Sequence, residues 1–199
     1  LDALRAVGVD VVVIDFENDL TAPARKVRAV AATLGVPERG EEVVAEYEAE
    51  LAHGLEIADA AVERSGRPLV LGLYVRSDIV QLVFGDGSGI DAVIEAAGGR
   101  DLGTELGVDD TGELSTEAII AAQPDFVLVT TRGADSVGGV DGVVALAGLE
   151  TTPIAKDPAR RVLQFDDQFL YGLGPRTGEL ITELATAIHL STTPPSTTP

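Results

Sequence analysis

Residues 37–65 have the sequence PERGEEVVAEYEAELAHGLEIADAAVERS, the longest uninterrupted helical pattern in the chain. Apolar side chains recur there at steps of three and four residues, and glutamates fill the opposite face. A helix of roughly 25 residues spans about 38 Å, which is close to the width of a small domain. The pattern therefore indicates either one long packed helix or a spine that joins two lobes.

After this helix, residues 66–190 alternate between short apolar runs and amphipathic segments. The runs predict strands, and the segments between them predict helices that begin at a capping residue such as Ser115 or end at glycine. Strands are expected at residues 69–74, 126–130 and 161–165, and helices at residues 90–97, 115–122, 140–146 and 175–190. Alternation of this kind predicts an α/β fold, a lobe with a Rossmann-like parallel sheet.

The residues before the long helix follow a similar pattern. Residues 1–8 predict the end of a helix, the β-branched run Val9–Asp15 predicts a strand buried on both faces, and residues 21–34 predict a second helix. Residues 3–14 also repeat the pattern of residues 118–129, a helix end followed by a turn, an aspartate and an apolar strand. We therefore expect two similar lobes, with the first cut short.

The expected division of the chain follows from these patterns. It is a remnant of the first lobe (1–36), a spine helix (37–65), a second α/β lobe (66–190) and a tail of serine, threonine and proline (191–199). The chain lacks methionine even at position 1, so we expect that it is not a complete translation product. Any signal peptide or lipid anchor would have been removed with the missing N-terminal part.

Composition excludes several classes of function. The 199 residues include 33 acidic and 14 basic side chains, giving a formal net charge of −19. Such a surface repels phosphate backbones and anionic lipids, so nucleic acid is not an expected partner. The sequence contains no cysteine and therefore no thiolate site. No apolar run approaches the roughly 18 residues of a membrane span.

An enzyme is not supported by the pattern of reactive residues. The only histidines are His53 and His189, and neither belongs to a recognisable nucleophile motif. The glycine loop at residues 85–89 lacks the lysine of a phosphate-binding loop and the spacing of the dinucleotide fingerprint. We therefore assign no catalytic residue.

Tyr74 and Arg76 are the strongest candidates for a binding site. They lie where the strand that begins at residue 69 ends, and ligands of open α/β sheets bind at the carboxyl ends of strands. Residues two apart in a strand point to the same side. A guanidinium favours phenolate, a donor suited to ferric iron, and could also meet a ligand carboxylate such as a propionate. The alternative is a tyrosine that caps the strand, with Arg76 in solvent or paired with Asp78.

Several motifs resemble the substrate-binding proteins of bacterial ABC importers, the two-lobed type with a single spine helix (class III), and most closely their haem-binding branch. The resemblance covers residues 1 to about 190. The motifs shared with this family are LVLGLYVR (69–76), FGDGSGI (84–90), GGRDLG (98–103), LSTEA (114–118), QPD (123–125), TRGADSVGGVDG (131–142) and LYGLGPR (170–176). The tyrosine–arginine pair and the segment 131–142 carry the assignment to haem.

The resemblance implies a monomeric protein that captures haem outside the cytoplasmic membrane and delivers it to an ABC permease. It would be periplasmic or a cell-surface lipoprotein, held to the membrane only through its missing N-terminal part. Tyr74 would be the iron ligand, Arg76 would keep it ionised, and Glu117 would dock on the permease. Glu117 is otherwise an ordinary first-turn glutamate, favoured by the helix dipole. Tyr171 is the rival iron ligand, and Tyr47 is expected to serve packing.

The chain also departs from this family. Most of the first lobe is missing, including the histidine that would supply the opposite axial ligand, so the fragment is expected to bind haem weakly. Two alternatives stay open. One is a binder of a ferric siderophore or cobalamin with the same fold. The other is an α/β enzyme or a metal-binding adhesin, which would need clustered histidines and carboxylates.

Overall fold

The computed structural model describes residues 1–14, 18–77, 80–146 and 148–190. The strands of these residues form one sheet in the order β4-β2-β1-β5-β6, with the short β3 paired to β1. The strands are β1 (Leu69–Arg76), β2 (Val80–Phe84), β3 (Arg100–Asp101), β4 (Thr111–Gly112), β5 (Phe126–Thr130) and β6 (Val162–Phe165). The β1–β5 and β5–β6 pairs are parallel, as predicted, and β1 also pairs in parallel with β3, a short strand that the sequence analysis did not predict. The β1–β2 and β2–β4 pairs are antiparallel, which the sequence analysis did not predict.

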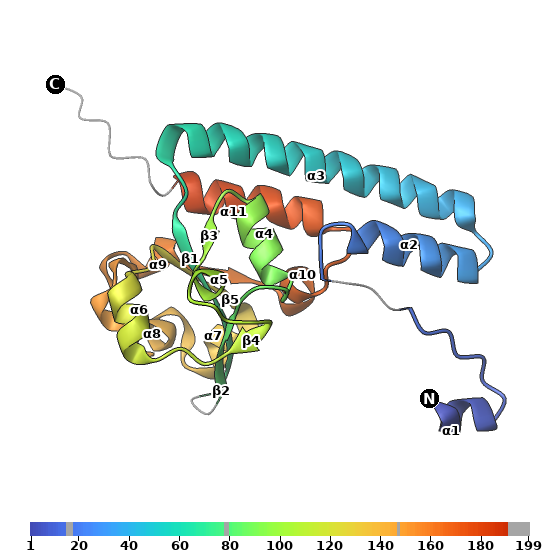
Figure 1. Ribbon diagram of the computed structural model, residues 1–199, viewed down its shortest axis with the longest axis horizontal. Coiled ribbons are helices and arrows are strands. Elements are labelled where there is room, and N and C mark those ends of the chain that lie inside the picture. The colour runs from blue at the N-terminus through green and yellow to red at the C-terminus, as the bar shows by residue number, and fades with distance from the viewer. Residues whose placement is uncertain (15–17, 78–79, 147, 191–199) are drawn as a thin grey trace.

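Helices cover both faces of this sheet, which confirms the predicted α/β fold (Figure 1). The helices are α1 (Asp2–Ala6), α2 (Ala22–Thr33), α3 (Pro37–Ser65), α4 (Ile90–Ala96), α5 (Leu102–Glu105), α6 (Thr116–Ala122), α7 (Thr131–Ser136), α8 (Gly139–Val144), the 3-10 turns Leu149–Thr151 and Pro153–Lys156, α9 (Pro158–Arg161), α10 (Asp167–Tyr171) and α11 (Thr177–Leu190). One core lies between the sheet and α4 and α11, and the other between the sheet and α6, α7 and α8.

Residues of β1 alternate between these two cores. Val70 belongs to the core with α4 and α11, whereas Leu71 and Leu73 belong to the opposite core. Gly72 faces α4, where a Cβ atom would lie 3.2 Å from a methyl carbon of Ile90. Because side chains of a strand alternate strictly, the next even positions of β1 continue the face that α4 and α11 cover.

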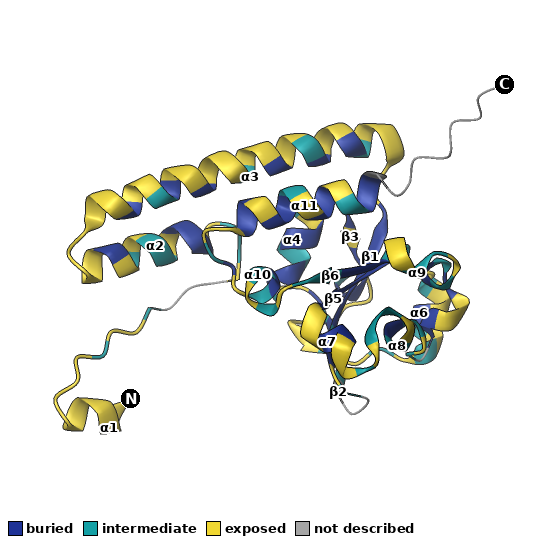
Figure 2. Cartoon of the chain, turned by 180° about the vertical axis from the view of Figure 1, so that it is seen from behind, coloured by how far each residue is buried: buried dark blue, intermediate teal, exposed yellow. Residues whose placement is uncertain are grey.

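The long helix α3 has the bounds that the sequence predicts. It starts at Pro37, whose fixed φ suits a first helical position, and ends at Gly66 with a φ of 74°. Its exposed face is turned away from α11 (Figure 2). The two helices approach closely at two glycines. A Cβ atom on Gly178 of α11 would lie 2.5 Å from the backbone nitrogen of Leu51, and one on Gly54 would lie 3.0 Å from Ile181.

The predicted strand at Val9–Asp15 is wrong for the residues that the structure describes. Residues 9–14 have no strand assignment, and the side chains of Val12 and Val13 are 60% and 50% exposed. In Figure 1 this segment leads away from the sheet toward α1. A strand needs a hydrogen-bonded neighbour, and no described strand lies beside it. Asp15 and the predicted tail 191–199 lie outside the described residues.

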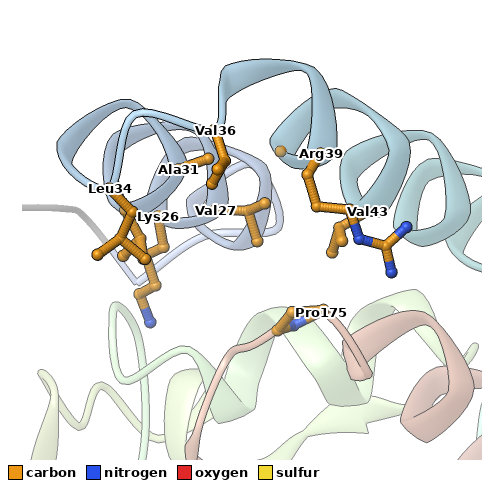
Figure 3. A pocket seen from close by; sticks show the side chains of 10 residues that line it. Lys26, Val27, Ala31, Leu34, Val36, Arg39, Val43 and Pro175 are labelled. Carbon is orange, nitrogen blue, oxygen red and sulfur yellow. The ribbon is translucent and has the colours of Figure 1, made fainter.

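Helix α2 packs against the first half of α3 rather than against the sheet. An apolar groove of about 360 Å³ lies between these helices and Pro175 (Figure 3). The Nζ of Lys26, at one side of the groove, donates hydrogen bonds to the carbonyl oxygens of Gly172 and Leu173, at 3.2 and 3.0 Å. Helix α2 is therefore tied to the loop between α10 and α11. No helix of the described residues is both long and apolar enough to cross a membrane.

Candidate functional site

The carboxyl ends of the parallel strands β1, β5 and β6 meet at one edge of the sheet, and this edge carries the candidate site. Tyr74 and Arg76 are the last even-numbered residues of β1, so both belong to the face that α4 and α11 cover. Helix α7 begins directly after β5, and α10 begins two residues after β6. Three loops of the lobe therefore converge where open α/β sheets bind their ligands.

Tyr74 is half-buried in a cluster of three aromatic rings. Its ring centroid lies 6.4 Å from that of Phe84 on β2, with the planes at 86°, and 6.1 Å from that of Tyr171 on α10. Phe84 and Tyr171 themselves lie 5.3 Å apart. Edge-to-face and tilted pairs of this kind are stabilising and fix ring orientation. The phenol of Tyr74 is thus positioned by two other rings while part of it stays open to solvent.

Arg76 ends β1 with its side chain exposed. Within the described part of the chain, its guanidinium forms neither a hydrogen bond nor an ion pair. The pairing with Asp78 considered from the sequence concerns a residue outside that part. The next residue, Ser77, has a φ of 58°, and its backbone N–H donates to the Oγ of Ser136 on α7 at 2.9 Å. This hydrogen bond ties the end of β1 to α7.

Of the other two tyrosines, Tyr47 is buried, and Tyr171 is half-buried with its hydroxyl oxygen buried. Burial raises the pKa of the Tyr171 hydroxyl well above its usual range, although neighbouring Thr130 acts in the opposite direction. Tyr47 on α3 donates a hydrogen bond to the carbonyl oxygen of Leu20 at 2.5 Å, and burial raises its pKa to about 12. A phenolate at either position would be costly. Tyr47 therefore serves packing, as predicted, and Tyr171 supports the ring of Tyr74.

Glu117 lies in the first turn of α6 with its side chain exposed. The predicted cap is present, because the Oγ of Ser115 accepts a hydrogen bond from the backbone N–H of Ala118 at 3.1 Å. The cap fixes where the helix starts and so presents Glu117 on the surface of the lobe. That position suits both the docking role and the ordinary first-turn role.

The structure brings one histidine beside a serine, which the sequence analysis did not foresee. The Nδ1 of His189 lies 3.0 Å from the Oγ of Ser65, at the C-terminal ends of α11 and α3. Ser65 donates its own proton to the carbonyl oxygen of Ala61 at 2.9 Å, so its oxygen accepts from the imidazole. A serine held in this way is not activated as a nucleophile. His53, on the exposed face of α3, lies twelve residues before Ser65 on the same helix.

Two further residues at the ligand edge were missed. Arg132, in the first turn of α7, lies 3.8 Å from Asp167 of α10, measured between Nε and Oδ2. The only feature of the sequence that could have indicated Arg132 and Asp167 is that each lies two residues after the end of a parallel strand. No group of three or more histidine, aspartate or glutamate side chains in the described ranges is placed to hold a metal ion.

Comparison with known families identifies the chain. No curated protein sequence matches it, but residues 1–166 match the family described as periplasmic binding protein. This chain is a periplasmic binding protein. The match covers α1 to α3 as well as the strands that form the ligand edge.

Solved structures of similar periplasmic binding proteins share this fold. The haem-binding protein RhuT from Roseiflexus sp. RS-1, in its apo form, is 40% identical with a TM-score of 0.90, and the match covers 96% of this chain and 71% of RhuT. The haem-binding protein BhuT, in complex with two haems, is 31% identical with a TM-score of 0.83, over 96% of this chain and 70% of BhuT. The haem-binding protein HmuT is 27% identical with a TM-score of 0.85, over 95% of this chain and 60% of HmuT.

The HmuT structures include three alanine variants. One replaces a histidine, one a tyrosine, and one the arginine two positions after that tyrosine. Tyr74-Val75-Arg76 has the same tyrosine–arginine spacing.

Proposed function

We propose that this periplasmic binding protein captures haem outside the cytoplasmic membrane and delivers it to an ABC import permease. The observation that carries the proposal is the placement of Tyr74 and Arg76 at the ligand edge of the lobe, one half-exposed and the other without an ion pair among the described residues. Three haem-binding proteins with the same fold support it.

The proposed chemistry at this edge is ligation of ferric iron by a phenolate. The Tyr74 oxygen binds the iron, and the Arg76 guanidinium stabilises the negative charge on that oxygen. Phe84 and Tyr171 hold the Tyr74 ring in place and offer apolar surface to the edge of the porphyrin. Binding and release of the ligand require no catalytic residue.

Titration with haemin tests the proposal. We expect a shifted Soret band and the charge-transfer band of a tyrosinate–iron complex. The Tyr74→Phe variant should lose that charge-transfer band and bind at least about tenfold more weakly, because it lacks the donor oxygen. The Tyr171→Phe variant is the matched control, since it removes a buried hydroxyl from the same ring cluster. An unchanged spectrum for Tyr74→Phe would contradict the assignment of the ligand.

The same titration separates haem from the second candidate ligand class, a ferric siderophore or cobalamin. A protein of that class should show no Soret shift with haemin, and Tyr74→Phe should not alter its spectrum. The Tyr-x-Arg spacing shared with HmuT favours haem.

We further propose that Glu117 docks on the permease. A carboxylate on the surface of the lobe can pair with a basic pocket of that partner. Glu117→Gln should leave haemin binding unchanged and reduce stimulation of the permease ATPase. Glu150→Gln, another exposed glutamate, is the control. Equal stimulation by Glu117→Gln and wild type would reject the docking role.

A further inference from the structure

The ligand edge carries a second guanidinium besides Arg76. Arg132 follows β5 by two residues, and β5 pairs in parallel with β1, with Gly72 beside Leu128. The end of β1 and the start of α7 are in contact, since a Cβ atom on Gly133 would lie 3.1 Å from the carbonyl oxygen of Val75. The two arginines therefore approach the same edge from adjacent strands, in a chain whose net charge is −19.

The charge of Arg132 is only loosely neutralised. Its side chain is 85% exposed, and its ion pair with Asp167 has a separation of 3.8 Å, beyond hydrogen-bond distance. The Oδ2 atom of Asp167 is buried and accepts no hydrogen bond from the described residues. Because the two groups are 3.8 Å apart and Arg132 is largely in solvent, their ion pair contributes little free energy, and a better-placed carboxylate can compete with Asp167 for the guanidinium.

The position of Asp167 connects Arg132 to the iron-binding tyrosine. Asp167 and Tyr171 are four residues apart on α10, so they lie on the same face of that short helix. The ring of Tyr171 packs against that of Tyr74. Arg132 is thus linked to the ring of Tyr74 through Asp167 and Tyr171 of α10, whereas Arg76 extends directly from β1.

We propose that Arg132 binds a carboxylate of the captured ligand and gives up its contact with Asp167 to do so. This inference rests on the proposed function, because it assumes a tetrapyrrole with side-chain carboxylates near Tyr74. The guanidinium can form two parallel hydrogen bonds with a carboxylate, which an exposed lysine could not reproduce. Arg132 would then distinguish porphyrins by their acidic side chains, while Tyr74 recognises the iron.

The test compares haemin with haemin dimethyl ester, which has the same iron and ring but no free carboxylate. Arg132→Gln should weaken haemin binding about tenfold and leave binding of the ester within about twofold of wild type. Arg160→Gln is the control, because Arg160 is 71% exposed, has a 3.8 Å ion pair with Asp157, and precedes β6 at the opposite edge of the sheet. It should change neither affinity. Circular dichroism checks that the variants are folded.

Three results would overturn the inference. Equal losses for haemin and the ester, or no loss for either in Arg132→Gln, would show that Arg132 does not recognise a carboxylate. A third variant adds a change in the opposite direction. Asp167→Asn frees Arg132 from its competitor and should tighten haemin binding a few-fold, and weaker binding would also reject the exchange. Failure of the proposed function is distinct, because wild type would then show no Soret shift with haemin.

Discussion

Two segments of this chain have the same sequence pattern and different structures. Residues 3–14 and residues 118–129 each contain a helix end, a turn, an aspartate and an apolar β-branched run. The second run forms β5, buried along its whole length between β1 and β6. The first is exposed and unpaired in the described structure. The difference shows that a local apolar pattern gives a segment only a propensity for the strand conformation. A strand forms where neighbouring strands are present to pair with that segment.

The exposed apolar side chains are also concentrated in the first part of the chain. Nine of the twelve large exposed hydrophobic residues in the described structure lie before residue 37. They are Leu1, Leu4, Val7, Val9, Val12, Val13, Val30, Leu34 and Val36. The lobe buries its apolar residues on both faces of the sheet, whereas the described residues before α3 are covered mainly where α2 packs against α3.

Amide hydrogen exchange should show the largest difference between the two runs. Amides of β5 are hydrogen-bonded in the centre of the sheet and exchange only when the lobe opens. We expect them to exchange at least about 1,000-fold more slowly than the amides of residues 9–14. Mass spectrometry of peptides from the two segments measures this ratio. Comparable protection would mean that residues 9–14 are paired in solution.

Truncation of one apolar side chain in each run should separate their contributions to stability. Leu128 is fully buried, so Leu128→Ala should lower the free energy of unfolding by about 2–5 kcal/mol. Val12→Ala, at an exposed position, should change it by less than about 0.5 kcal/mol. Urea denaturation measures both values. A loss of more than about 1 kcal/mol for Val12→Ala would place Val12 in a core.

Close packing of the α3–α11 interface gives a smaller effect. Alanine normally favours a helix over glycine, but a methyl group on Gly178 would meet the backbone of α3. Gly178→Ala should therefore destabilise the protein by about 1–3 kcal/mol. Gly174→Ala is the control, because no atom lies within 4 Å of its added Cβ. Stabilisation by Gly178→Ala would show that the helices are farther apart.

The buried histidine His189 should make the stability of the protein depend on pH. Burial lowers the pKa of His189 from its ordinary value of 6.5, so the unfolded state binds a proton more readily than the folded state. The contribution of the neutral ring is complete above about pH 6.5 and is lost as the pH falls below it. We expect the free energy of unfolding to fall as the pH is lowered below about 6.5 in wild type and in His53→Gln, and to fall less in His189→Gln. Thermal denaturation across this range measures it, and identical curves would assign the effect to carboxylates.

Most of the fold could be predicted because its signals are local. The apolar period and the terminal proline and glycine define α3, and continuous apolar runs define β1, β5 and β6. β2 and β4 could not be predicted, since their order depends on antiparallel pairing with β1 and with each other. The strand expected at residues 9–15 is absent from the described residues 9–14 for a related reason. Its apolar run favours a strand, but whether a neighbouring strand pairs with it cannot be read from the run itself.

The candidate site likewise has a part that the sequence predicts and a part that it does not. Tyr74 and Arg76 were predicted from the end of one strand. The packing of Tyr171 on Tyr74 and the contact of Arg132 with Asp167 join residues from separate loops, which sequence spacing cannot place. Burial of the Tyr171 hydroxyl, which disfavours its phenolate form, also emerged only in three dimensions.

The place of α11 in the core has a consequence for biosynthesis. This last helix contributes Leu180, Ile181, Leu184, Ala185 and Ile188 to the cluster that also contains Val70 of β1 and Phe126 of β5. A nascent chain cannot complete that cluster until the end of α11 has emerged from the ribosome. The core on this face of the sheet therefore closes only when α11 is available, and a chain shortened before α11 would leave Val70 and Phe126 uncovered.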